Sequence, residues 1–307
     1  MKRVLIFSFQ NDFHALAIQQ LLKRHEADAD IVDTSAFPHA LPLVQRFSES
    51  ATSSIGERSL SEYHSVWWRR PQPPRPSPDI EDSEEARFAR RECREALWGV
   101  VFASTLPFYN VPEWEQRAAY KPYQLRIAQE CGLRVPDTLI TNRESEVIAF
   151  AQNHQHVVYK AFSATSLMMT DTRPLRAEDV PELWRLRYAP AIFQEYVPLG
   201  REYRITLVED KTFVAEVTIQ NPSAHYDWRL DQDYKVSRAH LPDYVVSKLQ
   251  ALRKKLSLHS GSIDLRETPS GELYFLEINP SGQFLFLDIF GFGGTEVADA
   301  FCSMLIQ

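Results

Sequence analysis

Residues 261–279 decide the fold prediction, and they read GSIDLRETPSGELYFLEIN. Two apolar segments flank a turn that contains Pro and Gly, which is typical of a β-hairpin. In such a hairpin Asp264 lies beside Glu277 of the neighbouring strand. Because side chains alternate between the two faces of a strand, Asn279 shares a face with Glu277. The sequence therefore predicts that three oxygen-donor side chains converge on one face.

This donor set suits magnesium. Mg²⁺ is a hard ion that binds one or two carboxylates together with phosphate oxygens and water. We therefore predict that Asp264, Glu277 and Asn279 hold Mg²⁺ together with the triphosphate of ATP. The carboxylate of Glu277 also needs a partner, because an unpaired carboxylate buried in such an apolar strand costs several kcal/mol. The alternative is a pair of strand carboxylates held by salt bridges.

Two lysines are candidates for binding the phosphates. Lys160 lies in the apolar segment 157–162, where an ammonium group needs a partner and a phosphate oxygen is a natural one. Lys121 opens a predicted helix. The alternatives are an edge-strand lysine for Lys160 and a solvated helix lysine for Lys121.

A strand that breaks at the Val-Pro pair of residues 197–198 predicts a hinge whose backbone groups can read the edge of adenine. The hinge residues are Gln194, Glu195, Tyr196 and Val197. Glu202 begins the next strand, from which it can reach ribose hydroxyls, and Arg204 shares its face. An arginine there can neutralise charge on a transferred phosphoryl group. The alternative is an ordinary Glu–Arg strand pair.

The order of predicted elements indicates a mixed α/β and α+β architecture. A strand–helix–strand opening over residues 3–33 is typical of a small domain with a parallel sheet. Five prolines within residues 71–78 predict an extended loop, and residues 81–104 predict a long helix rich in Glu and Arg. We predict domains at 1–112, 113–190 and 191–307. Further helices are expected at 118–132, 144–153 (capped by Asn142), 245–256 and 294–305, and strands at 65–68, 135–140, 157–162, 168–170, 192–196, 202–208, 213–220, 261–267 and 273–278.

Composition excludes several classes of protein. The hydrophobic content of 44% and charged content of 24% are typical of a globular protein. No apolar run approaches the roughly 20 residues of a membrane span, and the apolar start ends at Phe9, too early for a secretory signal. Three widely spaced cysteines argue against disulfides or a zinc site and favour a reducing cytoplasm. A net charge of −7 argues against a nucleic-acid partner.

The ordered set of motifs resembles the ATP-grasp superfamily over about residues 115–307. The motifs that carry this resemblance are Lys121, Lys160, Gln194-Glu195-Tyr196-Val197, Glu202-Tyr203-Arg204, Asp264 and Glu277-Ile-Asn279. Nearly the whole chain also resembles the microviridin-type ligases, the graspetide synthetases. The motifs that carry this second resemblance are Trp67-Trp68-Arg69-Arg70-Pro71, Lys121-Pro122-Tyr123-Gln124-Leu125, Val135-Pro136-Asp137-Thr138-Leu139-Ile140-Thr141-Asn142, Asp227-Trp228-Arg229 and the segment from Glu277 to Phe284.

The resemblance implies an ATP-grasp fold with an N-terminal α/β domain and two lobes that sandwich ATP. It implies an ADP-forming ligase that uses ATP and two Mg²⁺ ions to phosphorylate an Asp or Glu side chain of a ribosomal precursor peptide. A Thr or Ser hydroxyl or a Lys amine would then attack the acyl phosphate and close an ester or amide macrocycle. Arg229 would hold the acceptor carboxylate or its acyl phosphate, and Asp227 would position or deprotonate the nucleophile.

The implied partner is a precursor peptide with a leader and a Thr/Asp/Glu-rich core, the leader docking near residues 165–190. A homodimer is also expected, and a membrane partner is not. One departure from the family is residues 161–167, where many ATP-grasp enzymes have a glycine-rich loop and this chain has no glycine. Ser163, Thr165 and Ser166 could donate hydrogen bonds in its place.

Arg69 and Arg70 have two interpretations: a basic edge that contacts the peptide substrate, or solvated arginines beside a packed tryptophan. Two functional alternatives also remain. One is an ATP-grasp ligase for a small amino-acid or peptide substrate, resembling glutathione synthetase or the ribosomal-protein glutamate ligase. The other is a degenerate nucleotide-binding module that regulates rather than catalyses.

Overall fold

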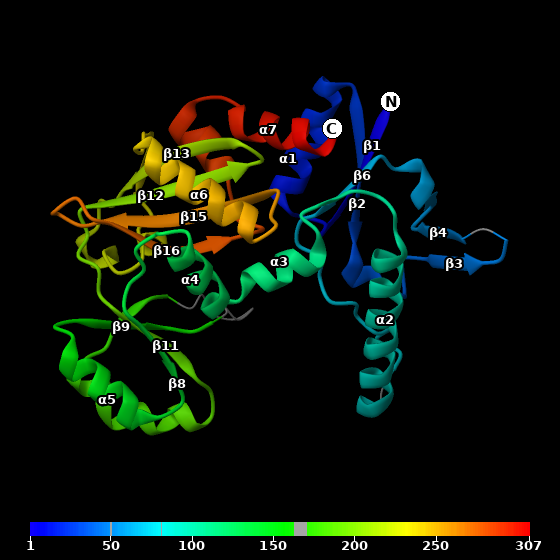
Figure 1. Cartoon of the computed structure of the whole chain (residues 1–307). Coiled ribbons are helices and arrows are strands. Elements are labelled where there is room, and N and C mark those ends of the chain that lie inside the picture. Colours follow the sequence, from blue (N-terminus) through cyan, green and yellow to red (C-terminus); the bar gives the residue numbers. More distant parts are fainter. Residues whose placement is uncertain (50, 81, 163–170) are drawn as a thin grey trace.

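The computed structural model describes residues 1–49, 51–80, 82–162 and 171–307. Three larger sheets follow one another along the chain, together with a small three-stranded sheet in the first part (Figure 1). The candidate strand at 168–170 and the loop residues Ser163, Thr165 and Ser166 lie outside the described residues. Within the described ranges, no helix is long and apolar enough to cross a membrane.

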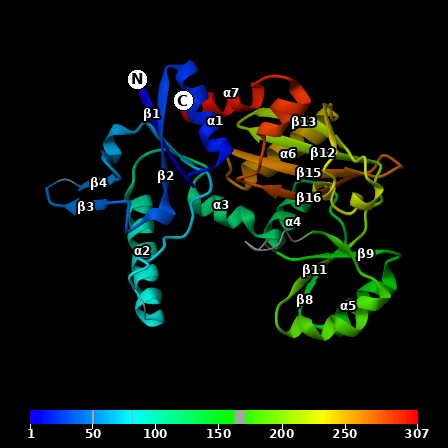
Figure 2. The same ribbon diagram turned by 180° about the vertical axis from the view of Figure 1, so that it is seen from behind.

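The N-terminal sheet is parallel, as predicted, in the order β2-β1-β6-β7. Its strands are β1 (Lys2–Ser8), β2 (Ala27–Asp33), β6 (Ser65–Trp68) and β7 (Phe108–Tyr109). Val4 and Ile6 of β1 pack in one core with α1 (Phe13–Leu22) and α7 (Glu296–Leu305), whereas Leu5 and Phe7 pack in another with α2 (Ser83–Ala103). The last helix therefore returns to the first domain, and both chain ends lie near each other (Figure 2).

The central sheet is antiparallel, in the order β10-β9-β11-β8. Its strands are β8 (Thr138–Thr141), β9 (Val157–Lys160), β10 (Arg173–Pro174) and β11 (Ala191–Glu195). Helix α5 (Glu144–Asn153) and a 3₁₀ segment (Ala177–Arg187) supply its apolar cover. Strand β11 lies beyond residue 190, so this sheet extends past the predicted start of the third domain; the predicted division itself stays a prediction.

The C-terminal sheet is antiparallel, in the order β14-β13-β12-β15-β16. Its strands are β12 (Arg201–Val208), β13 (Lys211–Thr218), β14 (Lys235–Arg238), β15 (Ser260–Glu267) and β16 (Leu273–Asn279). Helices α4 (Lys121–Glu130) and α6 (Asp243–Lys255) pack on one face through residues such as Ile205 and Ile263. The strand period of two then turns Arg204 and Asp264 to the opposite face, where the candidate site lies.

The structure differs from the predicted elements at several places. The helix expected at 118–132 is two helices, α3 (Pro112–Ala119) and α4, separated by an extended Tyr120, because Pro122 belongs in a first helical turn rather than in a helix interior. The N-cap of α5 is Arg143, which makes no side-chain capping bond, and not Asn142. The sheet β3 (Leu43–Phe47), β4 (Ala51–Ile55) and β5 (Arg58–Ser59) was not predicted, because its Ser- and Ala-containing strands carry little strand signal.

Candidate active site

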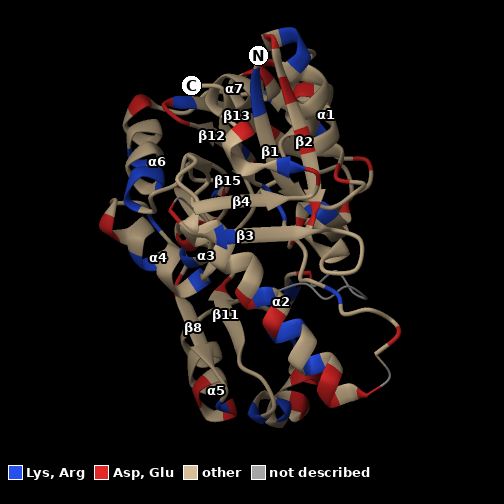
Figure 3. Cartoon of the chain, turned by 90° about the vertical axis from the view of Figure 1, so that its right-hand side faces the viewer, with Lys and Arg blue, Asp and Glu red and all other residues tan. Residues whose placement is uncertain are grey.

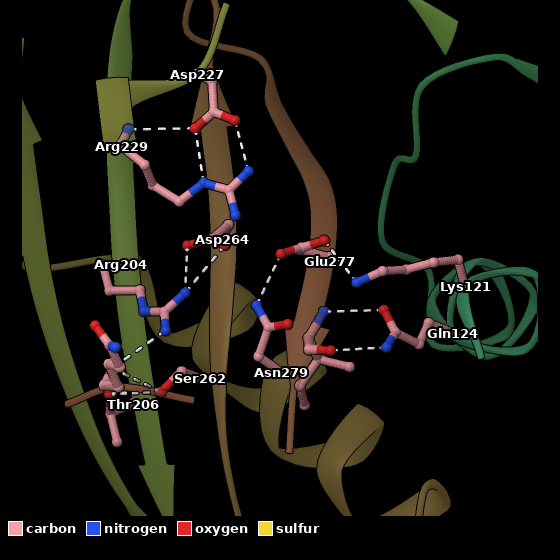
Figure 4. A network of polar contacts seen from close by, with 12 residues as sticks. Lys121, Gln124, Arg204, Thr206, Asp227, Arg229, Ser262, Asp264, Glu277 and Asn279 are labelled. Atoms are coloured by element: carbon pink, nitrogen blue, oxygen red, sulfur yellow. Dashed lines mark hydrogen bonds and ion pairs between the residues drawn. The ribbon is translucent and has the colours of Figure 1, made fainter. Parts of the chain in front are cut away.

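The hairpin β15–β16 brings the three predicted oxygen donors together. Asp264 pairs with Glu277 across the ladder, which is irregular immediately after Asp264. The amide of Asn279 donates to Oε1 of Glu277 over 2.8 Å, so the two side chains share one face (Figure 4). This arrangement follows from the alternation of a strand, whereas the role of these residues as metal ligands stays a prediction.

Each carboxylate is held by its own cation from a different element. Nζ of Lys121, at the start of α4, lies 2.6 Å from Oε2 of Glu277. Nη1 of Arg204 lies 2.8 and 3.0 Å from the two oxygens of Asp264, and its Nη2 donates to the backbone oxygen of Gln283. Arg204, predicted to act on the phosphoryl group, is thus nearly buried and positions Asp264 in this structure (Figure 4).

Lys160 reaches the same place from the central sheet. It lines a cavity of about 60 Å³ together with Asp264 and Glu277. Burial lowers the pKa of Lys160, while the charge of Glu277 acts to raise it. The cavity has room for only a few water molecules, since one water needs about 10–15 Å³ of such space. A nucleotide therefore requires the surrounding side chains or the two lobes to move apart.

Asp227 and Arg229 form a bidentate pair on the other side of this cavity. Nε and Nη2 of Arg229 lie 2.7 and 2.5 Å from the two oxygens of Asp227. This hydrogen bond raises the pKa of Arg229, against the effect of burial. Both oxygens of Asp227 are engaged by Arg229, so the geometry gives Asp227 a positioning contact with Arg229; its role toward a nucleophile stays a prediction.

Glu202 is buried and pairs with an arginine that the sequence analysis did not select. Nε of Arg266 lies 2.7 Å from Oε2 of Glu202, and Nη1 of Arg266 donates to the backbone oxygen of Val197 over 3.4 Å. Burial raises the pKa of Glu202 to about 7, although Arg266 opposes the shift. Arg266 could have been found from its spacing, because it lies two residues from Asp264 and so shares its face.

The hinge residues connect the central and C-terminal sheets. The backbone N–H of Glu195 and that of Tyr196 donate to the carbonyl oxygens of Asp137 and His156. Gln194 is buried, with its amide 2.9 Å from Oγ1 of Thr138. The hinge is therefore held by the central sheet, while Val197 touches the C-terminal sheet through Arg266.

Arg69 and Arg70 have a role that neither interpretation predicted. Arg69 is 2% exposed; its Nε lies 3.2 Å from Asp12, and its Nη1 donates to the backbone oxygens of Ser281 and Gly282 over 2.5 and 3.0 Å. Arg70 donates twice to the same Ser281 oxygen. The two arginines anchor the loop that follows β16. Arg69 is thus neither solvated nor open to a peptide.

Two further polar residues fix the same region. Gln124 of α4 donates to the backbone oxygen of Ile278 over 2.7 Å and accepts from its N–H over 3.1 Å, as a neighbouring strand would. It lies three residues after Lys121, on the same helix face. Glu115 accepts from the Ser281 hydroxyl over 2.6 Å, and burial raises its pKa to about 7.

The donor chemistry fits Mg²⁺ with phosphate, and not a metal held by protein alone. Among the described residues, no group of three or more His, Cys, Asp or Glu side chains could hold a metal. Asp264 and Glu277 with the amide of Asn279 match an ion that takes one or two carboxylates and completes its shell with phosphate and water. Lys121, Lys160 and Arg229 surround them, which suits a highly charged triphosphate.

Comparison with known proteins agrees with this geometry. No family model and no curated protein matches the chain. Among solved structures, the macrocyclase MdnC bound with precursor peptide MdnA, from Microcystis aeruginosa MRC, superposes with a TM-score of 0.88 at 27% identity over the whole of both chains. The chain has the ATP-grasp fold, and its structural neighbours are ATP-grasp ligases.

Two structures with ATP-grasp in their names also match over nearly the full length. A RiPP-associated ATP-grasp ligase of Chryseobacterium gregarium, in complex with ADP and a leader and core peptide, has a TM-score of 0.90 at 23% identity over 99% of this chain and 96% of that chain. A RimK domain ATP-grasp protein of Sphaerobacter thermophilus has a lower TM-score, 0.63 at 13% identity, over 99% of this chain and 100% of that chain. The predicted ATP-grasp fold, with its N-terminal α/β domain, is confirmed.

Proposed function

We propose that this ATP-grasp ligase activates Asp or Glu side chains of a ribosomal precursor peptide and joins them to Thr, Ser or Lys side chains, forming ester or amide macrocycles. The observation that carries the proposal is the face of β15–β16, where Asp264, Glu277 and Asn279 meet cations from both lobes. Solved neighbours of the same full-length architecture hold precursor peptides. One of them also holds ADP and another holds ADP and Mg, which supports a peptide substrate and the use of ATP and Mg²⁺.

The residues suggest a division of labour. Mg²⁺, when bound, would neutralise charge on the triphosphate. Lys121 and Lys160 would orient the phosphates, and Glu202 and the hinge would hold the nucleoside. A carboxylate oxygen of the peptide attacks the γ-phosphorus, and ADP leaves.

The resulting acyl phosphate needs nearby cations and exclusion of water until the second attack. Arg229, oriented by Asp227, is placed to supply such a charge. The hydroxyl or amine then attacks the acyl carbon, loses its proton, and phosphate leaves. Each linkage removes one water from the peptide in total.

The test uses the purified chain, Mg-ATP and a peptide encoded by a small open reading frame beside the gene, with a repeated Thr/Asp/Glu-rich core. Mass spectrometry should show the loss of one water per linkage together with peptide-dependent ADP release, and Asp264→Asn should abolish both. An untouched peptide, with free amino acids stimulating ADP release, would instead support the small-substrate ligase. Absence of turnover that Asp264→Asn leaves unchanged would indicate a regulatory module.

The proposal also covers the docking site of the leader, the oligomeric state and the cellular location. We expect a leader that docks near residues 165–190, a homodimer and a cytoplasmic location. The three cysteines are free in the structure, which supports a reducing compartment. Sedimentation analysis of the purified chain measures the oligomeric state directly.

A further inference from the structure

A groove of about 520 Å³ lies on the N-terminal domain, between helix α2 and the proline-rich loop that follows β6. Its floor contains Trp68, Leu97 and Trp98, with the two indole rings 5.4 Å apart between centroids. Pro71, Pro73 and Pro74 form the opposite wall. Because proline fixes the backbone, this wall is stiff, and the groove presents a preformed apolar surface.

The α2 side of the groove is strongly basic. Arg87, Arg90, Arg91 and Arg94 all line it. Their spacing of three and four residues places them on one helix face. Figure 3 shows basic and acidic residues alternating along α2. All four are exposed, whereas Leu97 of the same stripe is buried on the floor.

These positive charges are poorly compensated by the protein itself. Arg94 pairs with Glu95 over 3.1 Å. In the part of the chain that the structure describes, no carboxylate lies within ion-pair distance of Arg87, Arg90 or Arg91. Like charges three and four residues apart on a helix repel one another, so the stripe is disfavoured without an anionic partner. The chain as a whole is acidic, with a net charge of −7, so an acidic ligand is attracted chiefly to basic sites such as this one.

We propose that this groove binds an acidic, partly apolar segment of the peptide substrate, its carboxylates against the α2 arginines and its apolar side chains against the tryptophan floor. This inference rests on the proposed function, which requires a peptide that carries Asp or Glu. The combination of a charged wall and an apolar floor favours a peptide over a ligand that offers charge alone.

The groove is connected to the candidate metal site by a short stretch of chain. Pro71 directly follows Arg69 and Arg70, whose guanidinium groups hold the Ser281 carbonyl, two residues after Asn279. One domain therefore carries the basic groove and anchors the loop of residues 280–283. A peptide held in the groove is therefore bound to the same domain that contacts the loop beside the candidate active site.

The first experiment measures binding without nucleotide. A fluorescein-labelled synthetic peptide of alternating Glu and Leu is titrated with the full chain, and fluorescence anisotropy gives Kd. The double variant R90E/R91E should bind at least about tenfold more weakly, since two favourable charge contacts become repulsive. The matched control R24E/R46E, which makes the same change in charge at exposed positions outside the groove, should bind like the wild type.

Two further probes test the charge and the floor separately. A peptide of alternating Lys and Leu should bind R90E/R91E more tightly than it binds the wild type. A peptide of alternating Glu and Ser should bind the wild type more weakly than the Glu-Leu peptide does. Equal binding of the Glu-Leu peptide to wild type and R90E/R91E would overturn the inference, and so would tighter binding of a single-stranded oligonucleotide through the same arginines.

A second readout separates this inference from the proposed function. If R90E/R91E leaves KM for the precursor peptide and its product pattern unchanged, the groove inference fails while the ligase activity stands. If the wild type converts no precursor but its binding of the Glu-Leu peptide depends on the arginines, the proposed function fails and the groove still binds acidic peptides. Asp264→Asn, outside the groove, should bind the Glu-Leu peptide normally in both cases.

Discussion

Asp264 and Glu277 lie opposite each other on β15 and β16, and the pKa values of their carboxyl groups are shifted in opposite directions. Burial raises the pKa of Asp264, against the effect of Arg204. Burial also acts against ionisation of Glu277, but Lys121 and Lys160 outweigh it and hold its pKa well below the usual range. Two neighbouring carboxylates thus depend on surrounding cations, which is the charge pattern that a bound Mg²⁺ with phosphate would complete.

Replacement of either carboxylate by its amide should abolish catalysis while the fold is kept. In Asp264→Asn and Glu277→Gln the side chain keeps its shape, but each loses the charge that we expect to hold Mg²⁺. We expect peptide-dependent ADP release to fall at least about 100-fold, as when one charge-stabilising group of an active site is removed. Circular dichroism should show an unchanged secondary structure.

The control for this prediction is Asp210→Asn, the same chemical change at an exposed turn where the carboxylate pairs with Lys254. It should leave ADP release near the wild-type value. A similar loss of activity in all three variants would show that the effect is not local to the hairpin.

Lys160→Met should weaken ATP binding more than it alters the fold. The ammonium group is drawn into the cavity beside Glu277 at a cost in desolvation, which a phosphate would offset. We expect KM for ATP to rise at least about tenfold, one charge-assisted hydrogen bond being worth ~1.5–3 kcal/mol. Lys254→Met, at an exposed helix position, is the matched control; if both variants bind ATP like the wild type, Lys160 does not contact the phosphates.

The sequence predicted those parts of the site that depend on local geometry. Asp264, Glu277 and Asn279 belong to one hairpin, and the period of a strand is enough to place them on one face. The ion pair between Asp227 and Arg229 is equally local, since the two residues are two apart, but it was not predicted. The parallel order of the first sheet also followed from the local strand–helix–strand pattern.

The parts that the sequence could not predict depend on contacts between distant segments. Arg69 reaches Ser281, 212 residues away, and the basic motif alone does not reveal that its guanidinium is buried there. Gln124 of α4 makes strand-like hydrogen bonds to Ile278 at the edge of β16, 154 residues away. Such contacts arise from packing of the first domain and α4 against the last sheet, and a single sequence carries no pairing signal for them.

Arg69→Met should destabilise the protein strongly. The methionine fills much of the space but leaves Asp12 buried without its cation and frees the Ser281 and Gly282 carbonyls. Breaking a buried ion pair costs about 3–5 kcal/mol in the free energy of unfolding. Urea denaturation measures it. Arg58→Met, which removes a surface arginine paired with Asp30 and Glu62, should cost much less; equal losses would contradict the role assigned to Arg69.

His14 should make the stability depend on pH near neutrality. Its Nε2 accepts hydrogen bonds from the N–H groups of Phe284 and Leu285, over 3.0 and 3.3 Å, which requires that nitrogen to be unprotonated. Burial lowers the pKa of His14 from its ordinary value of 6.5, so the unfolded chain takes up a proton at a higher pH than the folded chain does. Its contribution to stability is therefore complete above that value and is lost as the pH falls through the window below it.

The measurement is the free energy of unfolding at about pH 7.5 and at about pH 5.5, on the two sides of the ordinary histidine pKa. The wild type should lose more stability between them than His14→Gln, whose amide oxygen can accept the same bonds and does not titrate. A slope that His14→Gln leaves unchanged would assign the pH dependence to other groups.

Gly282→Ala should impair catalysis through Arg204. A methyl group at residue 282 would stand 2.5 Å from Cβ of Ser262 and 3.0 Å from Nη2 of Arg204, closer than real contacts allow, so the loop or the arginine must shift. Since Arg204 holds Asp264, we expect ADP release to fall at least about tenfold, with a loss of about 1–3 kcal/mol in the free energy of unfolding from overpacking.

Gly99→Ala makes the same change inside α2, where an added methyl group meets nothing within 4 Å. It should retain full activity and gain up to about 1 kcal/mol of stability from helix propensity. Full activity in Gly282→Ala would show that the position of Arg204 tolerates the displacement.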